Sequence, residues 1–419
     1  MMRYVGLLVA AVATVTSLAT IGLGQVPTSP VVTGGVMLDA SGTVKMKASE
    51  PAQDLPRDMK TPGLTYVSLP RVIEKLREAT AAKKDVGDEV RYLAGLTQIR
   101  YVFIYPEQKD IVIAGPADTF DAKKNKYMPI GKTTGRPVLQ LDDVITALRV
   151  ANKGGAGYFG CSLDTAPDSQ KKSDAVAKEF GAGSRAKLVE EMKKAIGPQD
   201  VRIFGVPEDS RVAFSVVAAD YRMKRLSMGL ETFAVAGVTH AVDGGKPTTA
   251  RFWFETMYEP LKVSDDGLAY EFSGQRLQVK AGAQNFATDS KGVTEPALKF
   301  AENFTKKMPE IVQRHPIFAD LQNIADVGLL ATLVKEDKLA QKAGWDTTWV
   351  MDESVYKPEA LPVAKKAETQ VSIMNGAVAS GGVQLSYGTA MKQRETKPAA
   401  EVAAVKQRPE TSWFVTPTK

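Results

Sequence analysis

One short segment, residues 99–105, constrains the fold of this chain more than any other feature. Its sequence, IRYVFIY, is apolar or aromatic at nearly every position, whereas a strand with one solvated face alternates apolar and polar residues. A strand of this composition is typical of a sheet that is covered on both faces. The segment therefore predicts a layered fold in which helices pack against a sheet.

Three amphipathic helices are predicted between strands in the first half of the chain. The first begins after Ser68, which can cap it, the second covers residues 141–151, and the third begins at Ser184 and ends at a Gly-Pro pair. Asp142 and Asp143 fall in the first turn of the second helix, where a carboxylate complements the helix dipole. Their place at the helix start therefore explains the presence of both aspartates without a functional role.

The order of the strands predicts a mixed sheet. Residues 106–110 turn the chain from the first buried strand directly into residues 111–113, which predicts a hairpin, while helices separate other strands such as residues 200–206. Turns break the second half into short segments that are typical of antiparallel hairpins. These segments are residues 251–258, 268–272 and 276–280. We predict an α/β or α+β fold with a mixed sheet and packed helices.

A buried helical hairpin is predicted in the second half. Its helices are expected at residues 295–314 and from Pro316 onward, and residues 327–334 (VGLLATLV) are apolar on nearly all sides. A run of this length is too short to cross a membrane, so we assign it to the core. Returning strands are expected within residues 371–391.

We expect the chain to divide into five segments. Residues 1–24 form a signal peptide, and residues 25–62 form an extended lead with a small hairpin. Two lobes follow, an α/β lobe at residues 63–206 and an α+β lobe at residues 207–391. The last segment, residues 392–419, is rich in Lys, Ala, Pro and Glu and predicts a disordered tail. One continuous domain over both lobes is the alternative, because no linker marks the boundary.

The first 24 residues indicate export. Arg3 gives a short positive start, residues 4–21 are apolar or small, and small residues precede Gln25, which is the layout of a secretory signal peptide. We expect cleavage after Gly24, no stable membrane span afterwards, and a periplasmic or extracellular protein. An uncleaved membrane anchor is the alternative, since the apolar stretch is long for a signal.

Composition narrows the partners that the protein can have. Hydrophobic residues make up 44% and charged residues 24% of the chain, which is ordinary for a folded protein. The net charge of +6 mildly favours anionic surroundings such as envelope polymers. The sequence contains neither a basic run interleaved with aromatic residues nor a nucleic-acid motif, so we expect no nucleic-acid partner. With a single cysteine, the chain cannot form an internal disulfide.

The glycines near residue 157 imitate a dinucleotide-binding motif. Gly155, Gly157 and Gly160 match the spacing G-x-G-x-x-G. Such a site needs a strand before the glycines and a helix after them, so that the phosphates meet free amides at the helix start. Here the predicted helix comes first, and a strand at residues 158–163 follows. The glycines therefore predict the end of a helix, and we expect no cofactor.

A second phosphate-binding motif is also incomplete. Gly131-Lys132-Thr133 has the ending of a P-loop, but the residue five positions before Gly131 is Lys126, where the motif has glycine. No apolar strand leads into the segment. We expect Lys132 to lie on a surface loop.

Cys161, the only cysteine, has two interpretations. As a nucleophile it would need a base such as His240 or His315 within hydrogen-bond reach, and the sequence places neither beside it. A cysteine in a glycine-flanked apolar strand is otherwise a small buried hydrophobe. We keep Cys161 as a nucleophile candidate. One thiol and two distant histidines are too few ligands for a closed zinc site, so we expect no metal.

Residues 208–229 predict an amphipathic helix with three arginines on one narrow face. Arg211, Arg222 and Arg225 lie within about 60° of one another on a helical wheel, between two apolar sides. Guanidinium groups in such a row could bind a carboxylate or a phosphate. Alternatively, they pair with acidic side chains of the same chain or face water. We take the three as anion-binding candidates.

Several stretches of the chain together resemble a known family. They are FIYPEQKDIVIAGPAD, GRPVLQLDDVITALR, GCSLD, VPEDSRVAFSVVAADYRMKRLSMG and RFWF, in this order. The family that they resemble consists of exported bacterial proteins, chiefly of planctomycete type, and is known only as a domain of unknown function. The resemblance covers about residues 60–390 and implies export and a bacterial source. It implies no activity, ligand or catalytic residue.

Two functions of different classes remain open. The first is a non-enzymatic exported protein that binds or scaffolds a component of the cell envelope, with an anionic envelope polymer or another envelope protein as its partner. The second is a hydrolase or transferase that uses Cys161 or carboxylates brought together by the fold. The shortage of catalytic motifs favours the first function.

Overall fold

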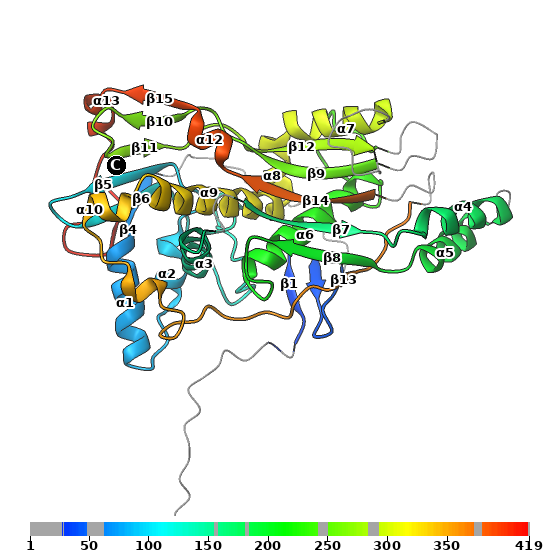
Figure 1. Cartoon of the computed structure of the whole chain (residues 1–419), viewed down its shortest axis with the longest axis horizontal. Coiled ribbons are helices and arrows are strands. Elements are labelled where there is room, and N and C mark those ends of the chain that lie inside the picture. The colour runs from blue at the N-terminus through cyan, green and yellow to red at the C-terminus, as the bar shows by residue number, and fades with distance from the viewer. Residues whose placement is uncertain are drawn as a thin grey trace, which may run out of the picture.

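Two mixed β-sheets with helices packed against them form the protein (Figure 1). The structure, a computed structural model, describes the following residues: 27, 29–47, 63–154, 158–180, 184–241, 250–283, 293–372 and 379–417. Within these residues the fold is mixed α/β, as the sequence predicts.

The larger sheet combines segments from the beginning, middle and end of the chain. Its strands, in spatial order, are β1 (Val31–Thr33), β2 (Val36–Leu38), β3 (Thr43–Met46), β13 (Lys366–Ala367), β8 (Gln199–Phe204), β7 (Tyr158–Asp164), β14 (Ala379–Ser386), β9 (Ala250–Met257) and β12 (Arg276–Ala283). Neighbours pair antiparallel except β3 with β13 and β14 with β9. At the β12 edge, the N–H of Val279 donates to the hydroxyl of Thr305 at 2.9 Å. This contact occupies a backbone group that another strand could otherwise use.

The smaller sheet contains the buried strand that was predicted from residues 99–105. Its strands, in spatial order, are β15 (Arg394–Lys397), β10 (Leu261–Ser264), β11 (Ala269–Glu271), β5 (Tyr101–Tyr105), β6 (Asp110–Pro116), β4 (Leu64–Ser68) and β16 (Phe414–Val415). β5 lies in the middle. Its Val102 and Ile104 join the main core, whereas Tyr101 and Phe103 belong to a separate apolar cluster. Burial on both faces confirms the prediction made from the sequence IRYVFIY.

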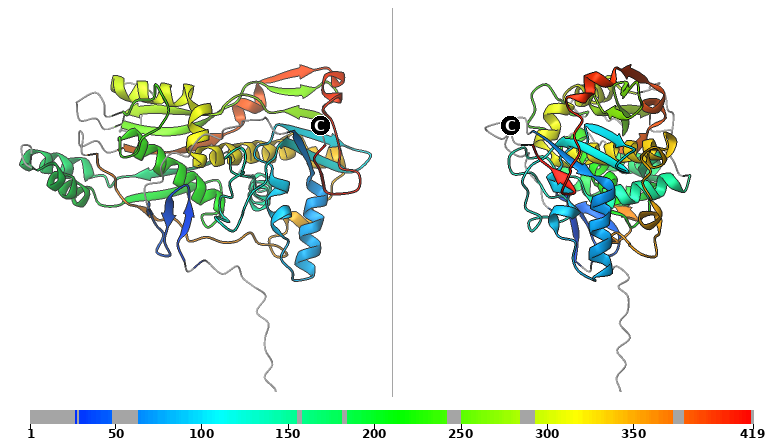
Figure 2. Two further views of the ribbon diagram at one scale, coloured as in Figure 1. Left: turned by 180° about the vertical axis from the view of Figure 1, so that it is seen from behind. Right: turned by 90° about the vertical axis from the view of Figure 1, so that its left-hand side faces the viewer.

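A central helix connects the two sheets. α9 (Pro316–Glu336) runs along the middle of the molecule (Figures 1 and 2). Near its start, Phe318 packs against Phe254 of β9. Just beyond its end, Asp337 pairs with Arg394 of β15 at 2.8 Å. Among the described helices, α9 alone is long and apolar enough to span a membrane, but its apolar window is entirely buried inside the protein, which is typical of a core helix.

The other helices surround α9 and the sheets. α3 (Leu141–Asn152) and α6 (Arg211–Ser227) contact α9 directly. The rest are α1 (Leu69–Ala81), α2 (Asp88–Arg91), α4 (Ser169–Phe180), α5 (Arg185–Ile196), α7 (Glu295–Lys306), α8 (Met308–Arg314), α10 (Leu339–Ala343), α11 (Thr348–Met351), α12 (Gly388–Lys392) and α13 (Ala399–Ala403), with a 3-10 turn at Leu93–Gly95. α4 and α5 form a hairpin that projects beyond the end of the larger sheet (Figure 1).

Local sequence signals predicted several helix ends correctly. Ser68 caps α1, since its hydroxyl accepts from the N–H of Arg71 at 3.3 Å. Gly154 follows α3 with a left-handed φ of +86°, and β7 comes next. The order of helix, glycine and strand that was predicted for this segment is therefore confirmed, although Gly155 and Gly157 lie outside the described residues. One helix differs from the prediction, because residues 295–314 form α7 and α8, which a proline at the start of α8 separates.

The expected division at residue 206 does not coincide with the division between the sheets. The larger sheet pairs β7 and β8 with β13 and β14 from the far end of the chain, and the smaller sheet pairs β5 with β11. Residues 31–46 form three strands of the larger sheet. β2 and β3 pair as the small hairpin that we expected, and β1 pairs with β2 where we expected an extended lead. Strand pairing between distant segments leaves no local pattern in a sequence. The predicted division at residue 206 therefore missed how the two sheets are assembled.

The end of the chain also differs from the disordered tail expected at residues 392–419. Residues 394–397 pair with β10 as β15, and residues 414–415 pair with β4 as β16. The carbonyl of Trp413 accepts from the N–H of Ser68 at 2.9 Å. A polar, low-complexity segment can add to a sheet edge because the pairing uses backbone groups that every residue except proline carries.

Candidate functional site

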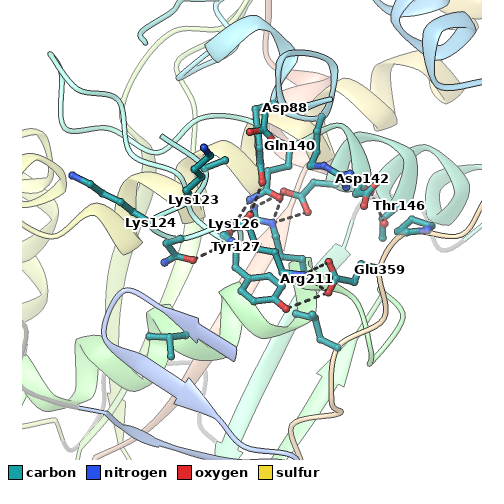
Figure 3. Close-up of a pocket in the computed structure, with 18 of the residues that line it drawn as sticks. Asp88, Lys123, Lys124, Lys126, Tyr127, Gln140, Asp142, Thr146, Arg211 and Glu359 are labelled. Atoms are coloured by element: carbon teal, nitrogen blue, oxygen red, sulfur yellow. Dashed lines mark hydrogen bonds and ion pairs between the residues drawn. The ribbon is translucent and has the colours of Figure 1, made fainter. Parts of the chain in front are cut away.

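A pocket of about 830 Å³ lies where α2, α3 and α6 meet the loop of residues 122–127. Pro358, Glu359 and Leu361 also line it, and Figure 3 shows the polar side chains that surround it. Pockets of this size are typical of sites for small ligands or parts of polymers. We call it the α6 pocket.

Ion pairs inside the protein hold the floor of the α6 pocket. Arg211, in the first turn of α6, donates from Nε to both oxygens of Asp143 at 3.0 Å and from Nη1 to Asp320 at 3.1 Å. It also donates to the backbone carbonyl of Tyr127 at 2.7 Å. Burial alone would lower the pKa of Arg211, but the two carboxylates outweigh burial and raise this pKa. The guanidinium therefore stays charged, in one fixed orientation.

A second network of carboxylates lines the wall of the α6 pocket. Glu359 accepts from the Nζ of Lys126 at 2.7 and 2.9 Å and from the hydroxyl of Tyr127 at 3.2 Å, and Figure 3 shows these side chains facing one another. Asp142 accepts from the hydroxyl of Tyr356 at 2.6 Å. Burial raises the pKa of Asp142. A protonated Asp142 could donate a hydrogen bond to a bound group.

Three lysines that line the α6 pocket lack such partners. The side chains of Lys47, Lys123 and Lys124 are exposed. Within the described part of the chain, none of the three ammonium groups has a carboxylate or hydrogen-bond partner. Arg91, by contrast, pairs with Asp85 at 2.5 Å. We call Lys123 and Lys124, which are adjacent on the loop, the mouth lysines.

The other two arginines that we predicted on the same helical face, Arg222 and Arg225, form ion pairs outside the α6 pocket. The Nε atoms of Arg222 and Arg225 each donate to one carboxylate oxygen of Glu231 at 2.6 Å. Arg222 is 2% exposed and also donates to the carbonyl of Gly34 at 2.6 Å. Arg225 donates to the side chain of Gln370 at 2.5 Å. All three arginines thus pair with carboxylates of the same chain. This is the alternative to anion binding that the sequence left open.

Cys161 lies in β7, inside the core. Its side chain is 1% exposed, and burial raises the pKa of its thiol well above the usual value, which disfavours the thiolate that a nucleophile needs. The ring of His240 contacts the carbonyl of Leu226 at 2.6 Å, and that of His315 contacts the carbonyl of Phe233 at 3.0 Å. Both rings are thus engaged with backbone groups. The geometry favours the interpretation of Cys161 as a buried hydrophobe.

The segment that imitates a P-loop binds a carboxylate of its own chain. The backbone N–H groups of Thr133 and Thr134 donate to Asp118 at 2.8 and 2.6 Å. These are the amides that a phosphate would need. Lys132 is exposed, as predicted. Asp265 and Asp266 lie in the turn between β10 and β11.

Within the described residues, no group of three or more His, Cys, Asp or Glu side chains is arranged to hold a metal ion.

Sequence patterns missed most of the α6 pocket. Asp143 has an adequate explanation in the helix dipole, and Asp320 is 109 residues away from Arg211 along the chain, so neither carboxylate could be assigned to the arginine. One local signal was present. Residues 123–126 (KKNK) hold three lysines in four positions, although the charges of the chain as a whole are dispersed.

Comparisons with known proteins give one result. No curated protein and no solved structure matches the chain. A family described as "Protein of unknown function (DUF1598)" matches residues 161–240. This segment begins at Cys161 and includes all of α6, whereas most of the residues that line the α6 pocket lie outside it. The chain contains, at residues 161–240, a DUF1598 domain of unknown function.

Proposed function

We propose that the protein is a non-enzymatic binding protein of the cell envelope and that the α6 pocket binds an anionic group of an envelope polymer. The mouth lysines carry this proposal. Arg211, Lys126 and Arg91 are committed to carboxylates of the same chain, so their charges are already compensated. The positive charge that a ligand can use therefore lies on the exposed lysines, Lys47 and the adjacent pair Lys123 and Lys124.

The floor of the pocket supports binding in a different way. Because Arg211 is held by Asp143, Asp320 and a carbonyl, a ligand meets a surface whose polar groups are already oriented. Preorganisation of this kind lowers the cost of ordering side chains on binding. Exposed lysines are flexible and hydrated, so they suit a repeating anionic polymer better than a single small ligand.

Export is part of the proposal. The signal-like layout of residues 1–24 and the family resemblance support it. Expression in a bacterial host with an outer membrane would place the protein in the periplasm, and mass measurement would give a chain that begins at Gln25. A full-length chain in the cytoplasm would contradict export.

Binding is tested with polygalacturonate as an anionic probe and dextran as a neutral one. We expect polygalacturonate to bind in calorimetry and its affinity to fall as salt rises from about 50 to about 500 mM, because salt screens exposed charges. Dextran should not compete. The double variant Lys123→Glu/Lys124→Glu should weaken polygalacturonate binding by about tenfold or more, since it reverses two charges at the mouth.

A charge-matched control is available on α4. Lys171 and Lys178 are exposed, and Lys171→Glu/Lys178→Glu changes the net charge by the same amount far from the pocket. Equal loss of affinity in both double variants would mean that only the overall charge matters, and the site would be rejected. Absence of any binding by the native protein at low salt would reject it as well.

Catalysis in the same pocket is a second candidate function, which one observation favours. Asp142 lines the α6 pocket with a raised pKa, as a general acid requires. We would measure the release of new reducing ends from polygalacturonate. Release that stops in Asp142→Asn, with unchanged binding, would establish a hydrolase and contradict the non-enzymatic proposal.

A further inference from the structure

A second, smaller pocket contains two tryptophans. It has a volume of about 310 Å³ and lies between α1, α11 and residues 344–346. Trp345 and Trp349 line it, both only partly buried. The chain has two other tryptophans, Trp253 and Trp413, which are 6% and 8% exposed. Two partly exposed indoles in one small pocket are therefore a distinct feature of this protein. We call it the tryptophan pocket.

The ring of Trp349 packs against a tyrosine ring. It stacks on Tyr356, with ring centroids 6.2 Å apart and planes 29° from parallel. The hydroxyl of Tyr356 in turn donates to Asp142 at 2.6 Å. Trp349 is thus fixed before any ligand arrives, which lowers the entropic cost of binding.

Charged side chains of both signs surround the two indoles. Glu74, Arg77, Lys109 and Asp346 line the pocket, and their formal charges cancel. Glu74 and Arg77 form an exposed ion pair at 3.4 Å, with side chains 51% and 56% exposed. Exposed pairs of this kind contribute little to stability. Each group can therefore leave its partner and bond to a ligand instead. Within the described residues, neither indole N–H has a hydrogen-bond partner, and both can also donate.

This combination selects one class of ligand. A pyranose ring has C–H groups on its faces and hydroxyl groups around its edge, so it can stack on indoles and also bond to charged groups. A hydrocarbon would leave the charged groups without partners when it displaced water. An anion would gain from Arg77 and Lys109 but be opposed by Glu74 and Asp346, and the reverse holds for a cation.

We infer that the tryptophan pocket binds a neutral pyranose residue of a saccharide. The residues that line this pocket and those that line the α6 pocket are different, so the inference does not depend on the proposed function. The small volume restricts it to one end or one short segment of a sugar chain.

Intrinsic fluorescence tests this inference on the full protein. Cellohexaose, chitohexaose and mannohexaose are titrated separately, and we expect at least one to shift or quench tryptophan emission with a dissociation constant in the millimolar range or tighter. Trp345→Ala should weaken that binding by about tenfold or more, while Trp345→Phe, which keeps an aromatic face, should retain most of it. The double variant of the mouth lysines should bind the sugar normally.

Calorimetry with the same sugars provides a readout that does not depend on the remaining indoles. Arg77→Ala leaves both tryptophans in place and should also weaken binding. The inference is overturned if none of the three sugars binds at millimolar concentration, or if Trp345→Ala binds as tightly as the native protein. A response to tetramethylammonium without a response to any sugar would overturn it too, because it would assign the pocket to cations.

Discussion

The arginines of α6 and the lysines of the loop at residues 122–127 carry the same charge but have different surroundings. Arg211, Arg222 and Arg225 are paired with carboxylates inside the protein. Lys123 and Lys124 are exposed and have no carboxylate partner in the described part of the chain. The comparison teaches that a row of arginines on a helix is not by itself a binding surface. Its partners decide whether it holds the fold or meets a ligand.

Removal of Arg211 should have the largest effect on stability. Arg211→Met would leave Asp143 and Asp320 buried without their cation, and breaking a buried pair in this way costs about 3–5 kcal/mol. Urea denaturation of this variant and of Lys171→Met, an exposed control, measures the difference. A loss below about 1 kcal/mol would show that the arginine is not essential to the fold.

His315 provides the opposite case, a buried group that is kept uncharged. It is 1% exposed, and burial lowers its pKa from 6.5 to about 4. The unfolded chain therefore takes up a proton at a higher pH than the folded one, so stability falls as the pH drops below about 6.5 and levels off below about 4. The full effect is about 3 kcal/mol.

The variant His315→Gln isolates this contribution, since the carboxylates titrate in both proteins. The stability difference between native protein and variant should shrink as the pH falls from 7 to about 4. Denaturation curves at a series of pH values measure it. A difference that does not change with pH would mean that His315 titrates as an exposed histidine does.

The smallest of the expected effects is the reactivity of the Cys161 thiol in the folded protein. Its buried thiol, with a raised pKa, should react with a thiol reagent only when the protein unfolds. We expect no labelling of native protein near neutral pH and one labelled site in denaturant, measured by mass. Rapid labelling of the folded protein would contradict this prediction and support Cys161 as a nucleophile.

The sequence predicted the local elements of this fold better than its long-range pairings. The burial of β5, the cap at Ser68 and the strand that holds Cys161 all follow from patterns within a few residues. The pairing of β3 with β13 and of β14 with β9 joins segments that are far apart, and no pattern in either partner specifies the other. Local periodicity therefore predicted elements and fold class, but neither the order of strands nor the sheets' boundaries.

The candidate sites show the same limit. The helix that carries Arg211, Arg222 and Arg225 was predicted correctly. The carboxylates that neutralise these arginines, such as Glu231 and Asp320, come from other segments. The KKNK cluster at residues 123–126 is visible in the sequence, yet its position beside a pocket depends on α3 and α6. The tryptophan pocket could not be predicted, because α1 contributes residues more than 250 positions before Trp345.

One measurement tests most directly the claim that the arginines hold the fold while the mouth lysines bind. Affinity for polygalacturonate and stability in urea are compared for Arg225→Gln and Lys123→Gln/Lys124→Gln at the same low salt. The account predicts that Arg225→Gln loses about 1–3 kcal/mol of stability and keeps its affinity, whereas the lysine variant keeps its stability and loses affinity by about tenfold. A folded Arg225→Gln protein that binds more weakly than the lysine variant would contradict the account.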